Sequence, residues 1–479
     1  MATDQVTILL DGKEISCRPD TSIAAALWEN GIRHLSHSHK FGHHRGLTCA
    51  RGHCTACLMR VDGEPNVRTC ETPVRAGQVV QTQDSGAVYG PPMQKMLDMG
   101  GNLFPVGFYY KWFTRPPLLS KAFLTTIRPM TGIGRIPDPS HLRALPAAPA
   151  PEDAPVAVPS RDLGRFETLV VGAGPSGLAA ALDCDHPVTV VDENKTLGGQ
   201  RYAALASLTT GEGPGLDRFP GLGAAWRRVS QLVTDFEAAD HCTFRPDTRV
   251  AAGYSPNGLV LRTGSDLFTA GFSTLAWCAG ALDTLGLFPG NDTPGLIGPR
   301  ALYRLLMRDG LNVAGSRALV IGGGLDFWLT ANLLATRGVR VNLVVTEPGW
   351  QSEVSAAVDL GWQLTTGLQL ETVHPRSESE LEAVFVPGRA TPGPADAHLN
   401  LRADFAVMCG RGKPAYDIPY QLGADLAVQP ARGGYAPAGI TGDRHTAPLP
   451  GGHTIAYAGE AAGNTPDAMA DPTRKDIRE

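Results

Sequence analysis

The 479-residue sequence contains no run of about 20 consecutive apolar residues, the length that a membrane-spanning helix needs, so no membrane span is predicted. Positive charge is not in excess, because 42 Lys and Arg residues face 47 Asp and Glu residues. The resulting net charge of −5 argues against nucleic acid or an anionic membrane surface as a partner. The beginning of the chain, MATDQVTILLDG, has no basic segment followed by a long apolar run, so we expect no secretory signal.

The cysteine pattern does not predict a disulfide framework. Five of the nine cysteines are scattered along the chain, and the other four are clustered near its beginning. A reducing cytoplasm is therefore the expected location. The sequence also lacks a Ser/His/Asp arrangement and carboxylates paired at helical spacing, so it points to no catalytic residue and leaves the substrate open.

The four clustered thiols are the most distinctive feature that is present. Cys49, Cys54, Cys57 and Cys70 follow the spacing C-x4-C-x2-C-x12-C. A tight loop with three thiolates and a more distant fourth one is typical of a [2Fe–2S] cluster. A structural zinc site is the alternative, but zinc ribbons use two C-x2-C pairs and only one is present here. We therefore predict that these cysteines are cluster ligands.

Histidines are concentrated around the same loop. Six of the 13 lie between residues 34 and 53, namely His34, His37, His39, His43, His44 and His53. A mixed Cys/His cluster is one interpretation. Because four suitably spaced cysteines are already available, we favour a polar lid over the cluster, or an interface.

The segments around the thiols predict a small β-grasp, ferredoxin-like domain over residues 1–88. Residues 5–17 alternate around Asp11-Gly12 as in a hairpin, a short alanine-rich helix follows, and a further hairpin and strand come after the thiols. Residues 89–164 have little periodicity and include a Pro/Ala-rich stretch, which predicts a linker and wrapping segment.

A dinucleotide-binding unit is predicted from residue 165 onward. In LVVGAGPSGLAAAL a buried strand runs into Gly172-x-Gly174-x-x-Gly177 and then into a helix. These glycines permit a tight turn, close approach of a pyrophosphate, and close helix–strand packing, and the helix N-terminus favours phosphate. Pro175 and Ser176 belong to the same turn, and Asp192, with Glu193 beside it, ends the next strand, where an acid binds the adenosine ribose.

A second strand–glycine–helix unit begins near residue 317. Its turn reads Gly322-Gly323-Gly324, with Phe327 at the third fingerprint position and Asp326 beside it. A bulky ring opposes close packing and a negative charge opposes phosphate, so nicotinamide binding is not favoured there. The fold class is therefore α/β, with two Rossmann-like domains, one inserted in the other: 165–298 with 400–479, and 299–399.

The stretch VDENKTLGGQR resembles the two-dinucleotide-domain flavoproteins, and this resemblance implies further cofactor contacts. The matching segments are the second glycine pair, TRV at 248–250, WCAGA and YAGEAAG. Through this resemblance, the implied contact residues are Gly199, Gln200, Arg201, Val250, Gly280, Gly459 and Glu460. Glu460 stands where that family usually has aspartate, so either FAD or NAD is expected at the main site.

The whole chain is similar to the α subunits of heterotetrameric sarcosine oxidase, dye-linked proline dehydrogenase, opine oxidase and hydrogen cyanide synthase. SHKFGHHRG, GFYYKWF, GAGPSGLAAAL, DENKTLGGQ, LFPGNDTPGL and CGRGKPAYDIPYQLGADL are the stretches that match. Sarcosine oxidase α subunits continue into a folate-binding domain, which this sequence does not include, and their N-terminal domain commonly lacks the four thiols.

This resemblance implies a cofactor-carrying, electron-transfer subunit of a flavin-dependent amine dehydrogenase or oxidase acting on a secondary amine or amino acid. The implied partners are an FAD-containing β subunit, a small extra subunit and an external electron acceptor. FMN is implied at the subunit interface. Two alternatives are a self-sufficient NAD(P)H-dependent reductase that passes electrons to its own cluster, and a non-catalytic scaffold with a structural dinucleotide.

Overall fold

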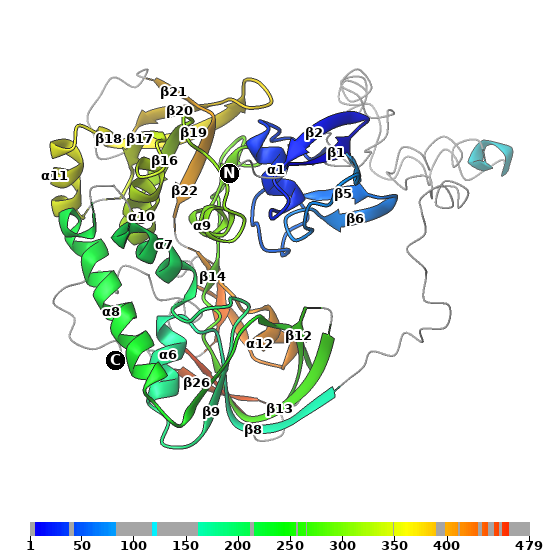
Figure 1. Ribbon diagram of the computed structural model, residues 1–479, viewed down its shortest axis with the longest axis vertical. Coiled ribbons are helices and arrows are strands. Elements are labelled where there is room, and N and C mark those ends of the chain that lie inside the picture. The colour runs from blue at the N-terminus through cyan, green and yellow to red at the C-terminus, as the bar shows by residue number, and fades with distance from the viewer. Residues whose placement is uncertain are drawn as a thin grey trace.

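The structure is a computed structural model that describes residues 5–37, 43–82, 117–121, 161–210, 215–254, 257–264, 266–347, 349–388, 398–410, 412–429, 434–438, 445–449 and 453–458. Three sheet-containing bodies are visible in Figure 1: an N-terminal sheet, a large sheet and a third sheet. Gly459, Glu460, His39, the aromatic segment 102–113 and most of the predicted linker lie outside the described residues.

The N-terminal sheet has five strands in the order β2-β1-β7-β5-β6, which is the predicted β-grasp arrangement. Its strands are β1 (Val6–Leu10), β2 (Lys13–Cys17), β5 (Leu58–Val61), β6 (Glu64–Arg68) and β7 (Val79–Gln81). Helix α1 (Ile23–Glu29) covers the sheet with a buried apolar face, and β3 (Ser36–His37) pairs with β4 (His44–Arg45). The hairpin prediction is confirmed, because Leu10 pairs with Lys13 around the turn at Asp11-Gly12.

The large sheet has eight strands. Their bounds are β8 (Arg161–Val171), β9 (Val188–Val191), β10 (Cys242–Arg245), β11 (Thr248–Tyr254), β12 (Gly258–Thr263), β13 (Asp266–Trp277), β26 (His445–Leu449) and β27 (His453–Tyr457). The strands β10, β9, β8, β13 and β27 run parallel. Strand β12 pairs antiparallel with β11 on one side and with β13 on the other. The accompanying helices are α6 (Pro175–Leu182), α7 (Gly199–Thr209), η2 (Leu216–Arg218) and α8 (Pro220–Glu237).

The third sheet is a parallel one, as a Rossmann-like unit requires, with the order β15-β22-β16-β17-β18. It comprises β15 (Leu296–Ile297), β16 (Arg317–Gly322), β17 (Arg340–Val345), β18 (Gln363–Thr366) and β22 (Phe405–Cys409), with α9 (Pro299–Met307), α10 (Gly324–Ala335) and α11 (Gln351–Asp359). A three-stranded antiparallel sheet of β19 (Leu368–Pro375), β20 (Leu381–Pro387) and β21 (Leu399–Ala403) adjoins it.

One domain assignment is wrong: β15 and β22 lie in the third sheet, not in the first dinucleotide-binding unit with residues 165–298 and 400–479. The apolar strand Phe405–Cys409 is buried between β15 and β16. A strand buried on both faces has the same apolar pattern in either parallel sheet, so the pattern cannot select its neighbours.

Several shorter elements lie in the later part of the described chain. They are β14 (Ala281–Leu282) paired with β23 (Lys413–Pro414), β24 (Leu426–Gln429) paired with β25 (Gly434–Pro437), and α12 (Asp417–Gln421). The N-terminal sheet and the third sheet share one apolar core, in which the rings of Trp28 and Phe405 lie 5.8 Å apart. The thiol-bearing domain is thus packed against the rest of the described chain, beside α9 (Figure 1).

Candidate functional site

The thiol loop is shaped so that backbone amides face its sulfurs. The Gly52 amide donates to Cys70 Sγ and the Cys54 amide donates to Cys49 Sγ, each at 3.3 Å. Left-handed backbone at Ala50 and Gly52, with φ of 50° and 68°, bends the loop into this form. Amide donors of this kind are what stabilise a thiolate-held iron–sulfur cluster.

The four thiols contact one another in a way that suits two metal ions. Hydrogen-bonding contacts join Cys49 to Cys54, Cys57 to Cys70, and Cys49 to Cys70. The hydrogen bond with Cys70 outweighs burial and lowers the pKa of Cys57 to about 7, which favours a thiolate. Two adjoining thiol pairs match a [2Fe–2S] cluster, in which each iron takes two cysteines.

The first glycine turn has the three properties that its sequence predicts. Gly172 has φ of 106°, and a Cβ there would lie 2.3 Å from the Cys278 carbonyl oxygen. A Cβ on Gly177 would lie 1.8 Å from the Gly172 oxygen, so helix α6 packs tightly on the turn. Gly174 is different, because no atom lies within 4 Å of where its Cβ would be. This open position, just before the N-terminus of α6, is where a phosphate can approach the backbone.

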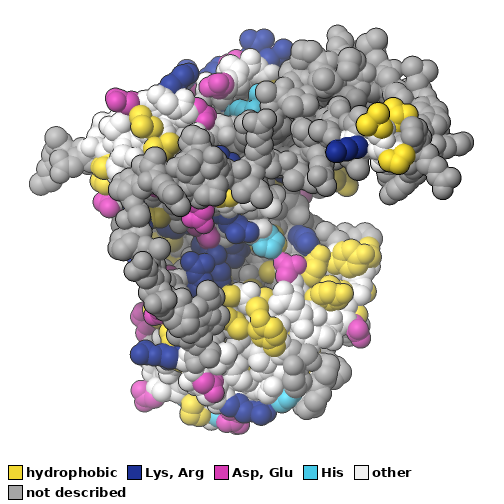
Figure 2. Space-filling view, turned by 90° about the vertical axis from the view of Figure 1, so that its right-hand side faces the viewer, with side chains coloured by type: hydrophobic (Ala, Val, Ile, Leu, Met, Phe, Trp, Pro, Cys, Tyr) yellow, Lys and Arg dark blue, Asp and Glu magenta, His cyan; other side chains and the backbone are white. Residues whose placement is uncertain are grey.

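The turn opens into a cavity of about 940 Å³. Such a volume is at the upper end of typical cofactor pockets. Of the cofactor-binding residues that the sequence predicts and the structure describes, all but one line this cavity. The exception is Gly177, which is buried beneath the turn. The lining residues are Gly172, Gly174, Pro175, Ser176, Asp192, Glu193, Gly199, Gln200, Arg201, Val250 and Gly280. Figure 2 shows a hollow on one face of the molecule in which Lys and Arg side chains gather.

The cavity also has a wall that sequence reasoning missed. Arg51, Gly52 and His53, which lie between the first two cluster cysteines, line it together with the residues of the first glycine turn. The predicted cluster site and the predicted dinucleotide site are therefore two sides of the same cavity. No sequence signal predicts this contact, because the two segments are more than 100 residues apart.

The two adjacent acids at the end of β9 have different surroundings. Asp192 accepts hydrogen bonds from the Ala173 amide at 2.6 Å and from the Asn194 amide at 2.7 Å, so its carboxylate holds the glycine turn in place. Burial raises the pKa of Asp192, although these amide donors oppose the shift. A role for Asp192 at a ribose remains a prediction.

Glu193 is the centre of an arginine network. It accepts from Arg51 and Arg304 at 2.8 Å and from Arg249 at 3.0 Å, and Arg249 also binds Glu71 at 2.7 Å. Burial opposes ionisation of Glu193, but the charges of the three arginines outweigh it and lower its pKa to about 2. Since Arg51 belongs to the thiol loop and Glu71 follows the fourth cysteine, this network fixes the thiol loop against the dinucleotide unit.

A further arginine supports the fourth cysteine from α9. Arg308, the residue that ends this helix, donates to the Cys70 carbonyl oxygen at 2.8 Å and pairs with Asp309. The loop around Cys70 is therefore held from the third sheet as well as from the large sheet.

The second glycine turn differs from the first. A Cβ on Gly323 would lie 2.7 Å from Glu347 Cβ, so a side chain closes on this turn, and Phe327 is fully buried. Asp326 does not project an unbalanced charge, because Arg201 binds its carboxylate through two nitrogens at 2.7 Å. Arg201, expected to contact the cofactor, thus links the two Rossmann-like units. Within the described chain, this second turn lines no part of the 940 Å³ cavity.

The histidines divide into separate groups. His43 pairs with Asp292 and His53 with Asp417, whereas His34, His37 and His44 lie together. Burial, together with the neighbouring rings of His44 and His37, lowers the pKa of His34 to about 4. Of the predicted lid, His53 does lie on the cavity wall beside the thiol loop.

Comparison with known proteins follows the same division of the chain. A family model described as a 2Fe-2S iron-sulfur cluster binding domain matches residues 3–85. Hydrogen cyanide synthase subunit HcnA of Pseudomonas aeruginosa is 32% identical over 80 residues, which are 17% of this chain and 76% of that protein. Sarcosine oxidase subunit alpha of Rhizobium meliloti is 26% identical over 376 residues, which cover 74% of this chain. The chain is thus a relative of hydrogen cyanide synthase subunit HcnA and of sarcosine oxidase α subunits, with an N-terminal [2Fe–2S] domain.

The match to a 2Fe-2S iron-sulfur cluster binding domain accounts for the four thiols and sets the zinc interpretation aside. The chain spans about a third of the length of the sarcosine oxidase α subunits that it matches. Its fold resembles the crystal structure of L-proline dehydrogenase from P. horikoshii, with a TM-score of 0.54, 15% identity and coverage of 98% of this chain and 73% of that one. In the described part of the chain, no helix is long and apolar enough to cross a membrane.

Proposed function

We propose that this chain is the cofactor-carrying and electron-transfer subunit of a multi-subunit, flavin-dependent amine dehydrogenase or oxidase that acts on a secondary amine or amino acid. The observation that carries the proposal is the shared cavity, whose wall combines the first glycine turn with the thiol loop. The same wall brings a two-electron cofactor site next to a one-electron carrier, which is the arrangement that such a subunit needs.

We infer that the cavity takes an adenine dinucleotide, FAD or NAD. Gly174 leaves room for a pyrophosphate, and the N-terminus of α6 points toward it. Gly199 packs directly on this turn, because a Cβ there would lie 3.0 Å from Gly174 Cα. Val250 and Gly280 line the remainder of the cavity, where Gly280 adopts φ of 72°.

Cys49, Cys54, Cys57 and Cys70 fit a [2Fe–2S] cluster, which supplies single-electron transfer when it is bound. The protein contributes the surroundings. The Gly52 and Cys54 amides stabilise thiolate charge, and Arg51, Arg249 and Arg304 keep Glu193 ionised beside the loop. These contacts position the thiol loop and the cavity relative to one another.

Amine oxidation itself belongs, in this proposal, to an FAD-containing β subunit of the sarcosine oxidase type. Next to the first glycine turn, Asp192 and Glu193 are already engaged in the chain's own contacts. An FMN site at the subunit interface, a small extra subunit and an external electron acceptor complete the proposed assembly. The Pro/Ala-rich and aromatic segments between residues 83 and 160 lie outside the described residues.

Co-expression with a neighbouring flavoprotein of the β type tests this proposal. We expect the two chains to co-purify, to contain an FMN that neither holds alone, and to oxidise an N-alkyl or cyclic amino acid with an artificial acceptor. The isolated chain should have no amine activity. Mass spectrometry of released cofactors, with iron and acid-labile sulfide assays, identifies what each chain holds.

Two outcomes would overturn the proposal. One is separate chromatographic behaviour of the co-expressed chains. The other is an isolated chain whose visible spectrum is bleached by NADH, which would establish the self-sufficient reductase instead.

A further inference from the structure

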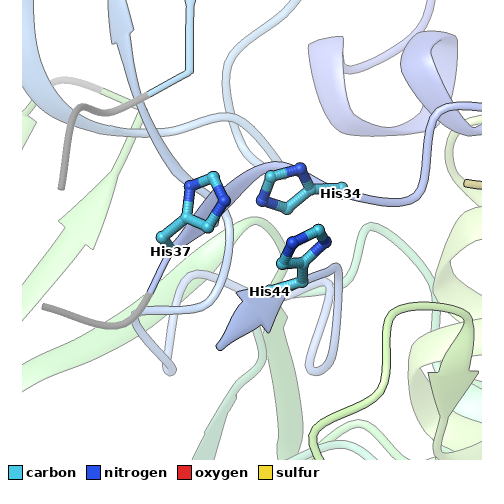
Figure 3. Close-up of side chains that lie close together, drawn as sticks. All are labelled: His34, His37 and His44. Carbon is cyan, nitrogen blue, oxygen red and sulfur yellow. The ribbon is translucent and has the colours of Figure 1, made fainter. Parts of the chain in front are cut away.

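Three histidines of the N-terminal domain come together in a group that contains none of the four thiols. One nitrogen from each of His34, His37 and His44 lies within 4.8 Å of those of the other two. Figure 3 shows the three rings pointing toward one another, with His37 and His44 on facing strands. In the part of the chain that the structure describes, this is the one group of histidines close enough to share an ion.

The local fold explains why these histidines meet. His37 in β3 and His44 in β4 are direct cross-strand partners, which places their side chains on the same face. His34 precedes β3, and the hydrogen bond from the Leu35 amide to the Arg45 carbonyl oxygen at 2.9 Å extends the pairing toward it. Short strand pairing, rather than a flexible loop, therefore positions the described members of the group.

The rings are packed face to edge and face to face. The centroids of His34 and His44 lie 4.1 Å apart in a stacked pair, and the ring of His37 lies edge-on to both at 4.2 Å and 4.9 Å. The Ser36 carbonyl oxygen lies 2.9 Å from His34 Nε2. A carbonyl can only accept, so Nε2 carries the proton in this pose and Nδ1 holds the lone pair, and a ring flip exchanges the two.

We propose that His34, His37 and His44 bind one divalent transition-metal ion of the Zn²⁺ type, distinct from the [2Fe–2S] site. Three imidazoles suit such ions, and three protein ligands leave a fourth position for water or another ligand. A tetrahedral Zn²⁺ with bonds of about 2.0–2.1 Å places its nitrogens about 3.3 Å apart. The histidine nitrogens therefore need to approach one another by no more than about 1.5 Å.

The position of this site ties it to the cluster domain. Ser36 lies between His34 and His37, and its hydroxyl donates to the Ala56 carbonyl oxygen at 3.3 Å. Ala56 directly precedes the cluster ligand Cys57. A metal ion held by the histidines would therefore stabilise the β3–β4 pair at the point where this pair contacts the thiol loop.

Zinc binding to the full-length chain, purified anaerobically with its cluster and treated with a mild chelator, tests the proposal. We expect one Zn²⁺ per chain by elemental analysis, bound with micromolar or tighter affinity in a titration, while iron and sulfide contents stay unchanged. Zinc K-edge absorption should show nitrogen neighbours at about 2.0–2.1 Å, and no sulfur at about 2.3 Å, which would indicate zinc in the thiol site.

Single variants identify the ligands. His37→Ala and His44→Ala should each weaken zinc binding at least tenfold, and His44→Gln should do the same with less disturbance of an exposed position. His43→Ala is the matched control, because His43 is the exposed neighbour of His44 and pairs with Asp292 instead. Iron content of each variant reports whether the domain remains intact.

Three outcomes overturn the proposal. They are no zinc beyond the level of the His37→Ala and His44→Ala double variant, sulfur in the zinc coordination shell, or equal loss of binding in the His43→Ala control. If a variant loses its iron, its zinc data are set aside. The zinc stoichiometry and the zinc coordination shell of the wild-type chain then test the proposal.

Discussion

The Glu193→Gln substitution tests whether the arginine network holds the thiol loop against the dinucleotide unit. The side chain of Glu193 is 14% exposed and balances Arg51, Arg249 and Arg304. A pKa lowered from 4.5 to about 2 corresponds to about 3 kcal/mol of preference for the ionised form. Removing one partner of a buried pair costs roughly 3–5 kcal/mol, so both lines of reasoning give a loss of about 3 kcal/mol.

The matched control is an ion pair between Arg317, at the start of β16, and Glu380, just before β20. Glu380→Gln removes an acceptor of Arg317, but this pair is partly exposed, at 28% and 39%, so we expect a loss below about 1 kcal/mol. Urea titrations of the anaerobic holoprotein, followed by the visible absorbance of the cluster, should show a much larger fall in midpoint for Glu193→Gln. Equal midpoints for the two variants would refute the inference that Glu193 holds these domains together.

The same carboxylate predicts a dependence on pH. Because the folded-state pKa of Glu193 lies below its ordinary value, its contribution to stability is complete above about pH 4.5 and is lost as the pH falls toward about 2. Unfolding free energies of the wild type and the Glu193→Gln variant, measured by tryptophan fluorescence, should therefore converge over that range. A constant difference down to the lower limit would show that the arginines do not depend on this charge.

Three further substitutions address the cluster, the cavity and the junction between the Rossmann-like units. Cys54→Ser should remove most of the iron and the visible bands while the dinucleotide stays bound; stoichiometric zinc without sulfide in the wild type would contradict this. Gly174→Val should abolish dinucleotide binding in a folded, iron-containing chain, because its side chain enters open space where the pyrophosphate approaches, and full cofactor content would place the nucleotide elsewhere. Asp326→Asn should cost about 3–5 kcal/mol in urea unfolding, because it removes the buried negative charge that binds Arg201 through two nitrogens, and a loss below about 1 kcal/mol would contradict this.

Features that depend on local sequence were predictable. The Asp11-Gly12 hairpin requires left-handed backbone at both residues, with φ of 47° and 82°, and this residue pair is suited to it. The thiol spacing and the first glycine turn are likewise short patterns with a direct geometric meaning. In each case the residues that specify the feature are neighbours along the chain.

Features that depend on the packing of distant segments were not predictable. β22 lies within residues 400–479, which were assigned to the first dinucleotide-binding domain, but it pairs in the third sheet, because its apolar run suits either sheet. Arg51 and its partner Glu193 are separated by 142 residues along the chain. Arg249 and its partner Glu71 are separated by 178 residues. Charged residues on a loop and on a strand edge have the same appearance in sequence whether they face solvent or each other.

The two acids at the end of β9 show how one short motif serves two purposes in this fold. Asp192 holds the glycine turn through the Ala173 amide, while Glu193, the next residue, faces the thiol loop and its arginine. Consecutive residues of an extended segment point in opposite directions, so adjacent carboxylates can serve opposite sides of the strand end. The position of the thiol loop is therefore set at the same point of the chain that shapes the nucleotide cavity.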